Sequence, residues 1–135
     1  MVIDSSALVA ILQNEPEKPG FLRAIDLSAV RLMSVASLVE ATIVIESRKG
    51  PAGRKAIDTF VARAGFDIRP VDLKQGDIAR DAYQKYGRGQ HPAGLNFGDC
   101  FAYALSVATG EPLLFKGTDF AKTDAAVAEL PSADA

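Results

Sequence analysis

Short apolar runs alternate with longer amphipathic segments along most of the chain, and this alternation limits the fold more than any other feature of the sequence. The apolar runs have the length of buried strands, and the segments between them repeat apolar residues with helical spacing. Strands joined through helices make right-handed crossovers, which build a mostly parallel sheet with helices on both faces. The sequence therefore predicts an α/β fold with a small doubly wound, mostly parallel sheet.

The bounds of the expected elements follow from these periodicities and from the polar, glycine and proline residues between them. We expect strands over residues 2–4, 30–33, 66–71 and 112–115. Helices are expected over residues 5–13 (capped by Ser5 or Ser6), 21–27, 52–64, 73–86 and 95–109, with another from Ser34 or Ser37 to Lys49 and a loose one from Ala125. A single domain is expected over residues 1–130, with a frayed end over residues 131–135.

The composition is that of a protein that folds without disulfides. The chain has 135 residues, of which 48% are hydrophobic, enough for one domain to form its own core. The single cysteine, Cys100, has no partner for an internal disulfide. This predicts that the protein is located in the reducing cytoplasm. No signal peptide or membrane span is expected, because no helix approaches the about 20 apolar residues that cross a bilayer.

Two aspartates stand at positions suited to chemistry. Asp4 directly follows the first expected strand, and open α/β sheets bind ligands at the carboxyl ends of their strands. Asp99 lies in an otherwise apolar helix, three residues after Asn96, which is placed to hold it by hydrogen bonding. Both have a structural alternative, because each also stands where a carboxylate can stabilise the start of a helix.

A third acid, Glu40, lies on a helix face otherwise formed by Ala36, Ile43 and Val44. We interpret this face as turned toward the core, where an ionised carboxylate is costly unless it is paired or bound to a cation. An ion pair with Arg23 or Arg31 is the structural alternative.

Together, the three acids predict a bound divalent cation, because like charges brought close together cost stability unless a cation neutralises them. Oxygen ligands without histidine or cysteine favour Mg²⁺, with Mn²⁺ as the substitute. The formal charge of -2 gives no support to RNA binding through overall charge, but a metal supplies local positive charge to an acidic site. The sequence lacks a phosphate-binding loop and a dinucleotide fingerprint.

Four stretches of the chain together resemble a known family. They are Val-Ile-Asp-Ser-Ser-Ala-Leu-Val-Ala at the N-terminus, the helix with Glu40, Asn-Phe-Gly-Asp at residues 96–99, and Pro-Leu-Leu-Phe-Lys-Gly-Thr-Asp-Phe at residues 112–120. In this order they resemble the PIN domains of VapC toxins from VapBC toxin–antitoxin modules. The resemblance implies a Mg²⁺-dependent endoribonuclease that cleaves structured RNA, such as tRNA or rRNA, to arrest translation. It also implies a cognate antitoxin and a homodimer within the toxin–antitoxin complex.

The resemblance also assigns roles by position. Asp4 and Asp99 match the family's principal metal ligands, Glu40 its third acid, and Ser6 and Asn96 its supporting polar positions. Many relatives carry an acid or Asn where this chain has Gly117. The fourth acid is therefore expected to be Asp119, with Asp124 as the alternative; a helix-capping role for Asp119 is also open.

Interactions with RNA and with the antitoxin complete the expected function. The candidates for RNA contact are Lys85, Tyr86, Arg88 and His91, with Tyr86 stacking on a base. We expect the antitoxin to insert an arginine among the three acids. Two other functions remain open: a receiver-like phospho-accepting signalling domain, and a catalytically inactive module of the same fold that binds RNA or a partner.

Overall fold

Four parallel strands form the central sheet of the computed structural model, which describes residues 1–132. They lie in the order β3-β2-β1-β4, and their bounds are β1 (Val2–Ile3), β2 (Leu32–Ser34), β3 (Asp67–Arg69) and β4 (Leu113–Leu114). The chain moves outward from β1 to β3 and then returns to place β4 on the other side of β1. The strand order reverses at β1 and β4, and in this class of fold such a reversal opens a crevice at the carboxyl ends of the strands.

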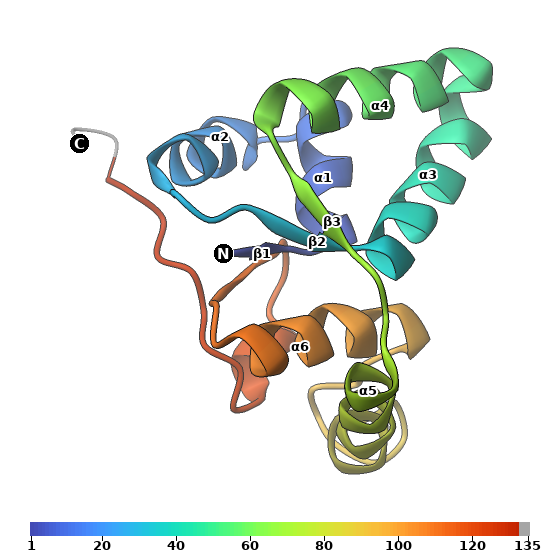
Figure 1. Ribbon diagram of the computed structural model, residues 1–135, viewed down its shortest axis with the longest axis vertical. Coiled ribbons are helices and arrows are strands. Elements are labelled where there is room, and N and C mark those ends of the chain that lie inside the picture. The colour runs from blue at the N-terminus through green and yellow to red at the C-terminus, as the bar shows by residue number, and fades with distance from the viewer. Residues whose placement is uncertain (133–135) are drawn as a thin grey trace.

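Helices cover both faces of this sheet (Figure 1). One face carries α1 (Ser5–Leu12), α2 (Lys18–Leu27), α3 (Val35–Lys49) and α4 (Pro51–Ala64). The other carries α5 (Leu73–Tyr86) and α6 (Phe97–Thr109), and a short 3-10 helix, η1 (Phe120–Lys122), follows β4. The predicted doubly wound α/β architecture is confirmed.

Two apolar cores lie on the two sides of the sheet. Because successive residues of a strand point to opposite faces, strands of two or three residues supply both cores. Ile3, Met33 and Leu114 belong to the core under α1–α4. Val2, Leu32 and Leu113 belong to the core under α5 and α6. All six side chains are at most 4% exposed, and each contributes about 1.5–3 kcal/mol to stability by its burial.

The helix ends show which side chains satisfy the free backbone N–H groups. Asp4 caps α1 by accepting a hydrogen bond from the Ser6 backbone N–H (3.0 Å), so the prediction of Ser5 or Ser6 as the cap is wrong. Ser34, one of the two predicted caps, begins α3. The predicted bounds of α5 agree with the structure, while α6 begins two residues later than predicted because Asn96 is its cap.

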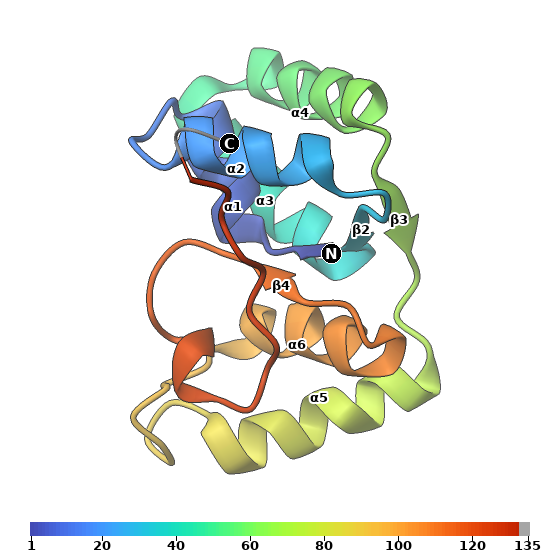
Figure 2. The ribbon, with the colours of Figure 1, turned by 90° about the vertical axis from the view of Figure 1, so that its left-hand side faces the viewer.

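The helix predicted from Ala125 is wrong. The described residues of this segment form no helix, and Val127 instead pairs in parallel with Leu113. The Leu113 N–H donates to the Ala126 carbonyl and the Ala128 N–H donates to the Leu113 carbonyl, each at 2.8 Å. Figure 2 shows the segment beside β4, whose free edge offers the hydrogen-bond partners that a helix would otherwise supply. Of the predicted frayed end, residues 133–135 lie outside the described residues.

Within residues 1–132, no helix combines the length and the apolar character needed to cross a bilayer.

Candidate active site

The three predicted acids come from different elements that meet at the carboxyl edge of the sheet. Asp4 follows β1, Glu40 lies in the second turn of the helix that follows β2, and Asp99 lies in the first turn of α6. Helices α3 and α6 lie on opposite faces of the sheet, but both begin at the carboxyl end of the strands and contact one another (Figure 1). The charges of Glu40 and Asp99 both act to raise the pKa of Asp4. The fold therefore brings the three carboxylates into one electrostatic environment.

The Asp4 carboxylate is almost fully buried, with 2% of the residue exposed. Its Oδ2 atom accepts hydrogen bonds from the Ser6 N–H (3.0 Å) and the Ser6 hydroxyl (2.6 Å). Its Oδ1 atom is buried without a hydrogen-bond partner among the described residues. Loss of hydration raises the pKa of Asp4 to about 6, although the Ser6 hydrogen bonds lower it. Asp4 is thus both a helix cap and the holder of one unsatisfied oxygen.

Ser6 joins Asp4 to the segment that follows β4. Its hydroxyl donates to Asp4 and accepts a hydrogen bond from the Lys116 backbone N–H at 3.0 Å. The Lys116 ammonium pairs with Glu15 and Glu17, which lie between α1 and α2. A supporting role for Ser6, expected from the resemblance, is therefore consistent with its contacts.

The sequence analysis placed Glu40 on a helix face turned toward the core, and the structure corrects this interpretation. The buried residues of α3 are Ser37, Ala41 and Ile45, whereas Ile43, on the supposed core face, is 65% exposed. Glu40 lies at the edge of the buried face, where its Oε1 accepts a hydrogen bond from the Ser5 hydroxyl at 2.5 Å. The alternative ion pair is absent from the described residues, since Arg31 donates to backbone carbonyl groups instead.

Asp99 and Asn96 form a capping box at the start of α6. The Asn96 N–H donates to Asp99 Oδ2 (3.0 Å), and the Asp99 N–H donates to Asn96 Oδ1 (2.9 Å). The structural alternative for Asp99 is therefore observed, but it engages one carboxylate oxygen and leaves the other available. Burial raises the pKa of Asp99, and the charges of Glu40 and Asp119 raise it further, while Arg88 lowers it.

The two candidates for the fourth acid differ in their surroundings. Asp119 is exposed, makes no capping hydrogen bond at the start of η1, and lies near enough to raise the pKa of Asp99. Asp124 accepts a hydrogen bond from the Tyr103 hydroxyl at 2.5 Å, and this bond is the main reason that its pKa is lowered. Of the two candidates, only Asp119 therefore influences the charge of Asp99, and the capping alternative for it is not observed.

The residues predicted to contact RNA divide into two groups. Tyr86 is 5% exposed and packs against His91 and Tyr103, so the prediction that its ring stacks on a base is wrong. The His91 ring accepts a hydrogen bond from the Ala93 N–H and so fixes the loop before α6. Lys85 and Arg88 are exposed, and Arg88 is close enough to Asp99 to lower its pKa.

Two residues that the sequence did not single out as part of the site lie inside it. Ser5 binds Glu40, and Gly98 lies directly against the Glu40 carboxylate. The sequence indicated Ser5 as a possible helix cap, and no pattern in it indicated that Gly98 contacts Glu40.

The donor set fits a hard divalent cation in part. Among residues 1–132, no three His, Cys, Asp or Glu side chains are already arranged to hold a metal ion. However, the buried Oδ1 atom of Asp4 lacks any partner and the donors around it are carboxylate oxygens, as Mg²⁺ and Mn²⁺ prefer. We take Asp4 and Asp99 as the two residues suited to hold such an ion.

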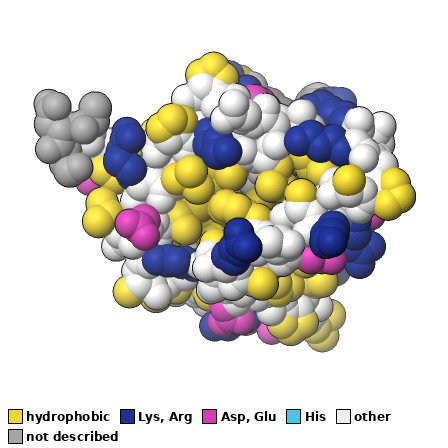
Figure 3. All heavy atoms as spheres, turned by 90° about the horizontal axis from the view of Figure 1, so that it is seen from above, with side chains coloured by type: hydrophobic (Ala, Val, Ile, Leu, Met, Phe, Trp, Pro, Cys, Tyr) yellow, Lys and Arg dark blue, Asp and Glu magenta, His cyan; other side chains and the backbone are white. Residues whose placement is uncertain are grey.

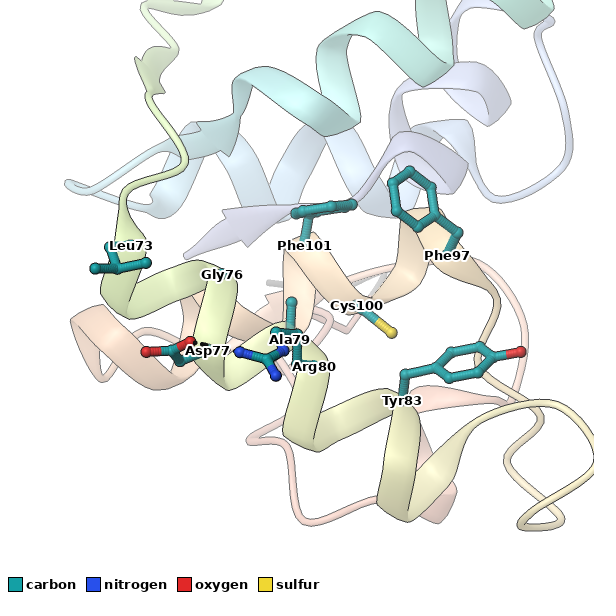
Figure 4. Close-up of a pocket in the computed structure, with 9 residues that line it drawn as sticks. All are labelled: Leu73, Gly76, Asp77, Ala79, Arg80, Tyr83, Phe97, Cys100 and Phe101. Atoms are coloured by element: carbon teal, nitrogen blue, oxygen red, sulfur yellow. Dashed lines mark hydrogen bonds and ion pairs between the residues drawn. The ribbon is translucent and has the colours of Figure 1, made fainter.

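Asp4, Glu40 and Asp99 do not line either of two surface grooves. The first, of about 510 Å³, is lined mainly by apolar side chains, by three arginines, Arg23, Arg31 and Arg63, and by one acid, Asp26. Figure 3 shows apolar side chains bordered by Lys and Arg on this side of the molecule. The second, of about 540 Å³, lies between α5 and α6 (Figure 4) and is lined mainly by apolar side chains, including Tyr83, Phe97 and Phe101. Its charged pair, Asp77 and Arg80, is exposed and forms an ion pair. Neither groove has the chemistry of the carboxylate edge.

Comparison with known proteins identifies the family. A model of the PIN domain matches residues 1–126. The chain belongs to the PIN-domain family. It is 50% identical over 131 residues to Ribonuclease VapC30 of Mycobacterium tuberculosis, with 97% of this chain and 100% of that protein covered. This PIN-domain protein therefore belongs to the VapC ribonucleases, and the match gives no support to a receiver-like signalling domain.

Solved structures show the same fold. VapC20 of Mycobacterium tuberculosis, described as a sarcin-ricin loop cleaving toxin, matches with a TM-score of 0.79 at 16% identity over 96% of this chain and 98% of its own. A chain of a toxin–antitoxin complex from Klebsiella pneumoniae matches with a TM-score of 0.67 at 16% identity, over 93% and 94% of the two chains. PIN-domain nucleases generally depend on a divalent metal.

The raised pKa of Asp4 predicts how the stability of the metal-free protein changes with pH. The folded protein holds the Asp4 proton more tightly than the unfolded chain, so the contribution of Asp4 to stability is greatest below about pH 4 and is lost as pH rises through 6. A rise in pKa from 3.8 to about 6 corresponds to about 3 kcal/mol. In urea unfolding with EDTA, Asp4→Asn should lose this part of the pH dependence and be more stable than the wild type at pH 7. If the wild type instead gained stability relative to Asp4→Asn between pH 4 and 7, the raised pKa of Asp4 would be contradicted.

Proposed function

We propose that this protein is a metal-dependent endoribonuclease that acts as the toxin of a type II toxin–antitoxin module and cleaves structured RNA, such as tRNA or rRNA. The observation that carries this proposal is the convergence of Asp4, Glu40 and Asp99 at one edge of the sheet, with one buried carboxylate oxygen of Asp4 unsatisfied. The 50% identity to a VapC ribonuclease supports the same reaction class.

Each acid has a part in the proposed reaction. Asp4 and Asp99 would hold Mg²⁺, or Mn²⁺ in its place, and the bound ion would supply Lewis-acid stabilisation of the phosphate and an acidified water. Ser6 fixes the orientation of Asp4, and Asn96 fixes that of Asp99. Glu40, held by Ser5, would orient the attacking water and accept its proton. Asp119 would complete the acidic edge.

RNA is proposed to approach over the loop that precedes α6. Arg88 in this loop and Lys85 at the end of α5 are exposed and can contact phosphate groups. Tyr86 and His91 pack against one another, and the His91 ring accepts a hydrogen bond from the Ala93 N–H. The proposed choice of structured RNA agrees with the description of VapC20, although that likeness concerns the fold.

A cognate antitoxin is the proposed partner, as in the complex from Klebsiella pneumoniae. We propose that it inserts an arginine among Asp4, Glu40 and Asp99, because a bidentate guanidinium matches buried carboxylates that lack a counter-charge. The groove with Arg23, Arg31 and Arg63 offers apolar contact and positive charge to an acidic amphipathic segment of the same antitoxin. An inhibited complex in which the three acids stay open to solvent would contradict the proposed insertion of an arginine.

The proposal includes a homodimer within that complex. Its most suitable contacts are apolar side chains that one copy leaves exposed, notably Ile43 of α3 (65%) and Phe97 of α6 (77%).

The experiment that tests the proposed function is cleavage of RNA by the purified protein. Asp99→Asn should reduce cleavage to background while the protein remains folded, because the amide cannot replace the carboxylate as a ligand. EDTA should silence the wild type, and Mg²⁺ or Mn²⁺ should restore it. Cleavage that persists in excess EDTA, or full activity in Asp99→Asn, would contradict the metal site.

The fourth acid can be tested with a matched pair of variants. Asp119→Ala should lower turnover at saturating RNA at nearly unchanged stability, because the charge of Asp119 acts on Asp99 and its side chain makes no capping bond. Asp124→Ala removes the hydrogen bond to Tyr103 and should mainly lower stability, by about 1–2 kcal/mol. Both effects can be read from kcat and from urea unfolding. The opposite pattern would assign the fourth acid to Asp124.

A further inference from the structure

The Glu40 carboxylate lies directly against the backbone of Gly98. A Cβ atom added at Gly98 would lie 2.2 Å from Glu40 Oε2, 2.6 Å from Cδ and 2.7 Å from Oε1. These separations are far below ordinary contact distances, so any side chain at position 98 competes with the carboxylate for the same space. Gly98 has no positive φ, so its backbone conformation does not require glycine. The close approach of the Glu40 carboxylate is what requires glycine at this position.

Ser5 also contacts the Glu40 carboxylate. Its hydroxyl donates to Glu40 Oε1 at 2.5 Å, and the residue itself is buried, with 8% exposed. Ser5 directly follows Asp4 in the sequence, just as Gly98 directly precedes Asp99. The same two chain segments that present Asp4 and Asp99 therefore also fix where Glu40 lies.

We propose that Ser5 and Gly98 are positioning residues for Glu40 in the RNA cleavage reaction. Ser5 holds one carboxylate oxygen by a hydrogen bond, and Gly98 leaves the space that lets the group lie beside Asp99. Neither residue touches the reacting atoms; both act through Glu40. This inference rests on the proposed function, because Glu40 must take part in the reaction for its position to matter.

The clash at Gly98 provides a clean test, because the atoms in the way are the far end of a flexible side chain. In Gly98→Ala, rotation of Glu40 can relieve the clash without moving the backbone, and alanine suits a helix better than glycine. The variant should therefore fold with an unchanged or higher melting temperature. The Glu40 carboxylate of this variant, however, is displaced from the site. A displacement of about 1 Å in an active site can cost up to about 100-fold in rate.

The experiment measures kcat, KM and melting temperature for Gly98→Ala and Ser5→Ala, in the wild type and in a Glu40→Asp background. Glu40→Asp withdraws the carboxylate by one methylene group from Gly98 and Ser5. In the wild type, each substitution should lower kcat by about 10- to 100-fold and leave KM within about twofold. In the Glu40→Asp background, the same substitutions should change kcat by less than about threefold, because the contact they disturb is already lost.

The matched control is Gly20→Ala. Gly20 also lies near the start of a helix, α2, and an added Cβ would meet nothing within 4 Å. Its kcat and KM should equal those of the wild type. A loss of kcat in Gly98→Ala as large in the Glu40→Asp background as in the wild type would overturn the proposal, as would wild-type kcat in both Gly98→Ala and Ser5→Ala.

A Glu40→Gln variant separates failure of this inference from failure of the proposed function. If Glu40→Gln is inactive while Gly98→Ala and Ser5→Ala keep wild-type kcat, only the positioning proposal is wrong. If Glu40→Gln itself keeps wild-type kcat, Glu40 has no part in the reaction, and both its proposed role and the positioning proposal are overturned.

Discussion

The buried carboxylate of Asp4 is the constraint around which the candidate site is arranged. Its position at the end of β1 removes it from water, which raises its pKa to about 6, and two hydrogen bonds from Ser6 satisfy only one of its oxygens. A buried, partly unsatisfied charge destabilises a fold unless something binds it. Asp99 and Glu40 nearby increase this cost, so the arrangement is best explained as a receptor for positive charge, either a divalent cation or the guanidinium of a partner.

The topology of the sheet makes this arrangement possible. Because β1 and β4 lie side by side where the strand order reverses, the residues after both strands and the starts of α1, α3 and α6 meet at one edge. The acids therefore need no long loops to hold them. Capping bonds and the Ser5 contact fix Asp4, Glu40 and Asp99 on helix turns, the kind of rigid support that a catalytic site requires.

The sequence predicted what depends on local patterns and missed what depends on distant contacts. The parallel α/β fold and the bounds of α5 followed from periodicity. The helix from Ala125 was wrong because the free edge of β4 pairs with Val127. The helix face on which Glu40 was predicted to meet the core is only partly buried, and Tyr86 is buried by packing that no local pattern reveals. The contact of Tyr103 with Asp124 and that of Gly98 with Glu40 likewise join residues far apart in the chain.

The central claim, that Asp4 and Asp99 hold a divalent cation, is tested most directly by an anomalous difference map from crystals of the wild-type protein grown with Mn²⁺. The account predicts a strong peak within coordination distance of carboxylate oxygens of both residues, and its loss in Asp4→Asn. A map without a peak there, or with Mn²⁺ bound only elsewhere, from protein that cleaves RNA in the same Mn²⁺ buffer, would contradict it.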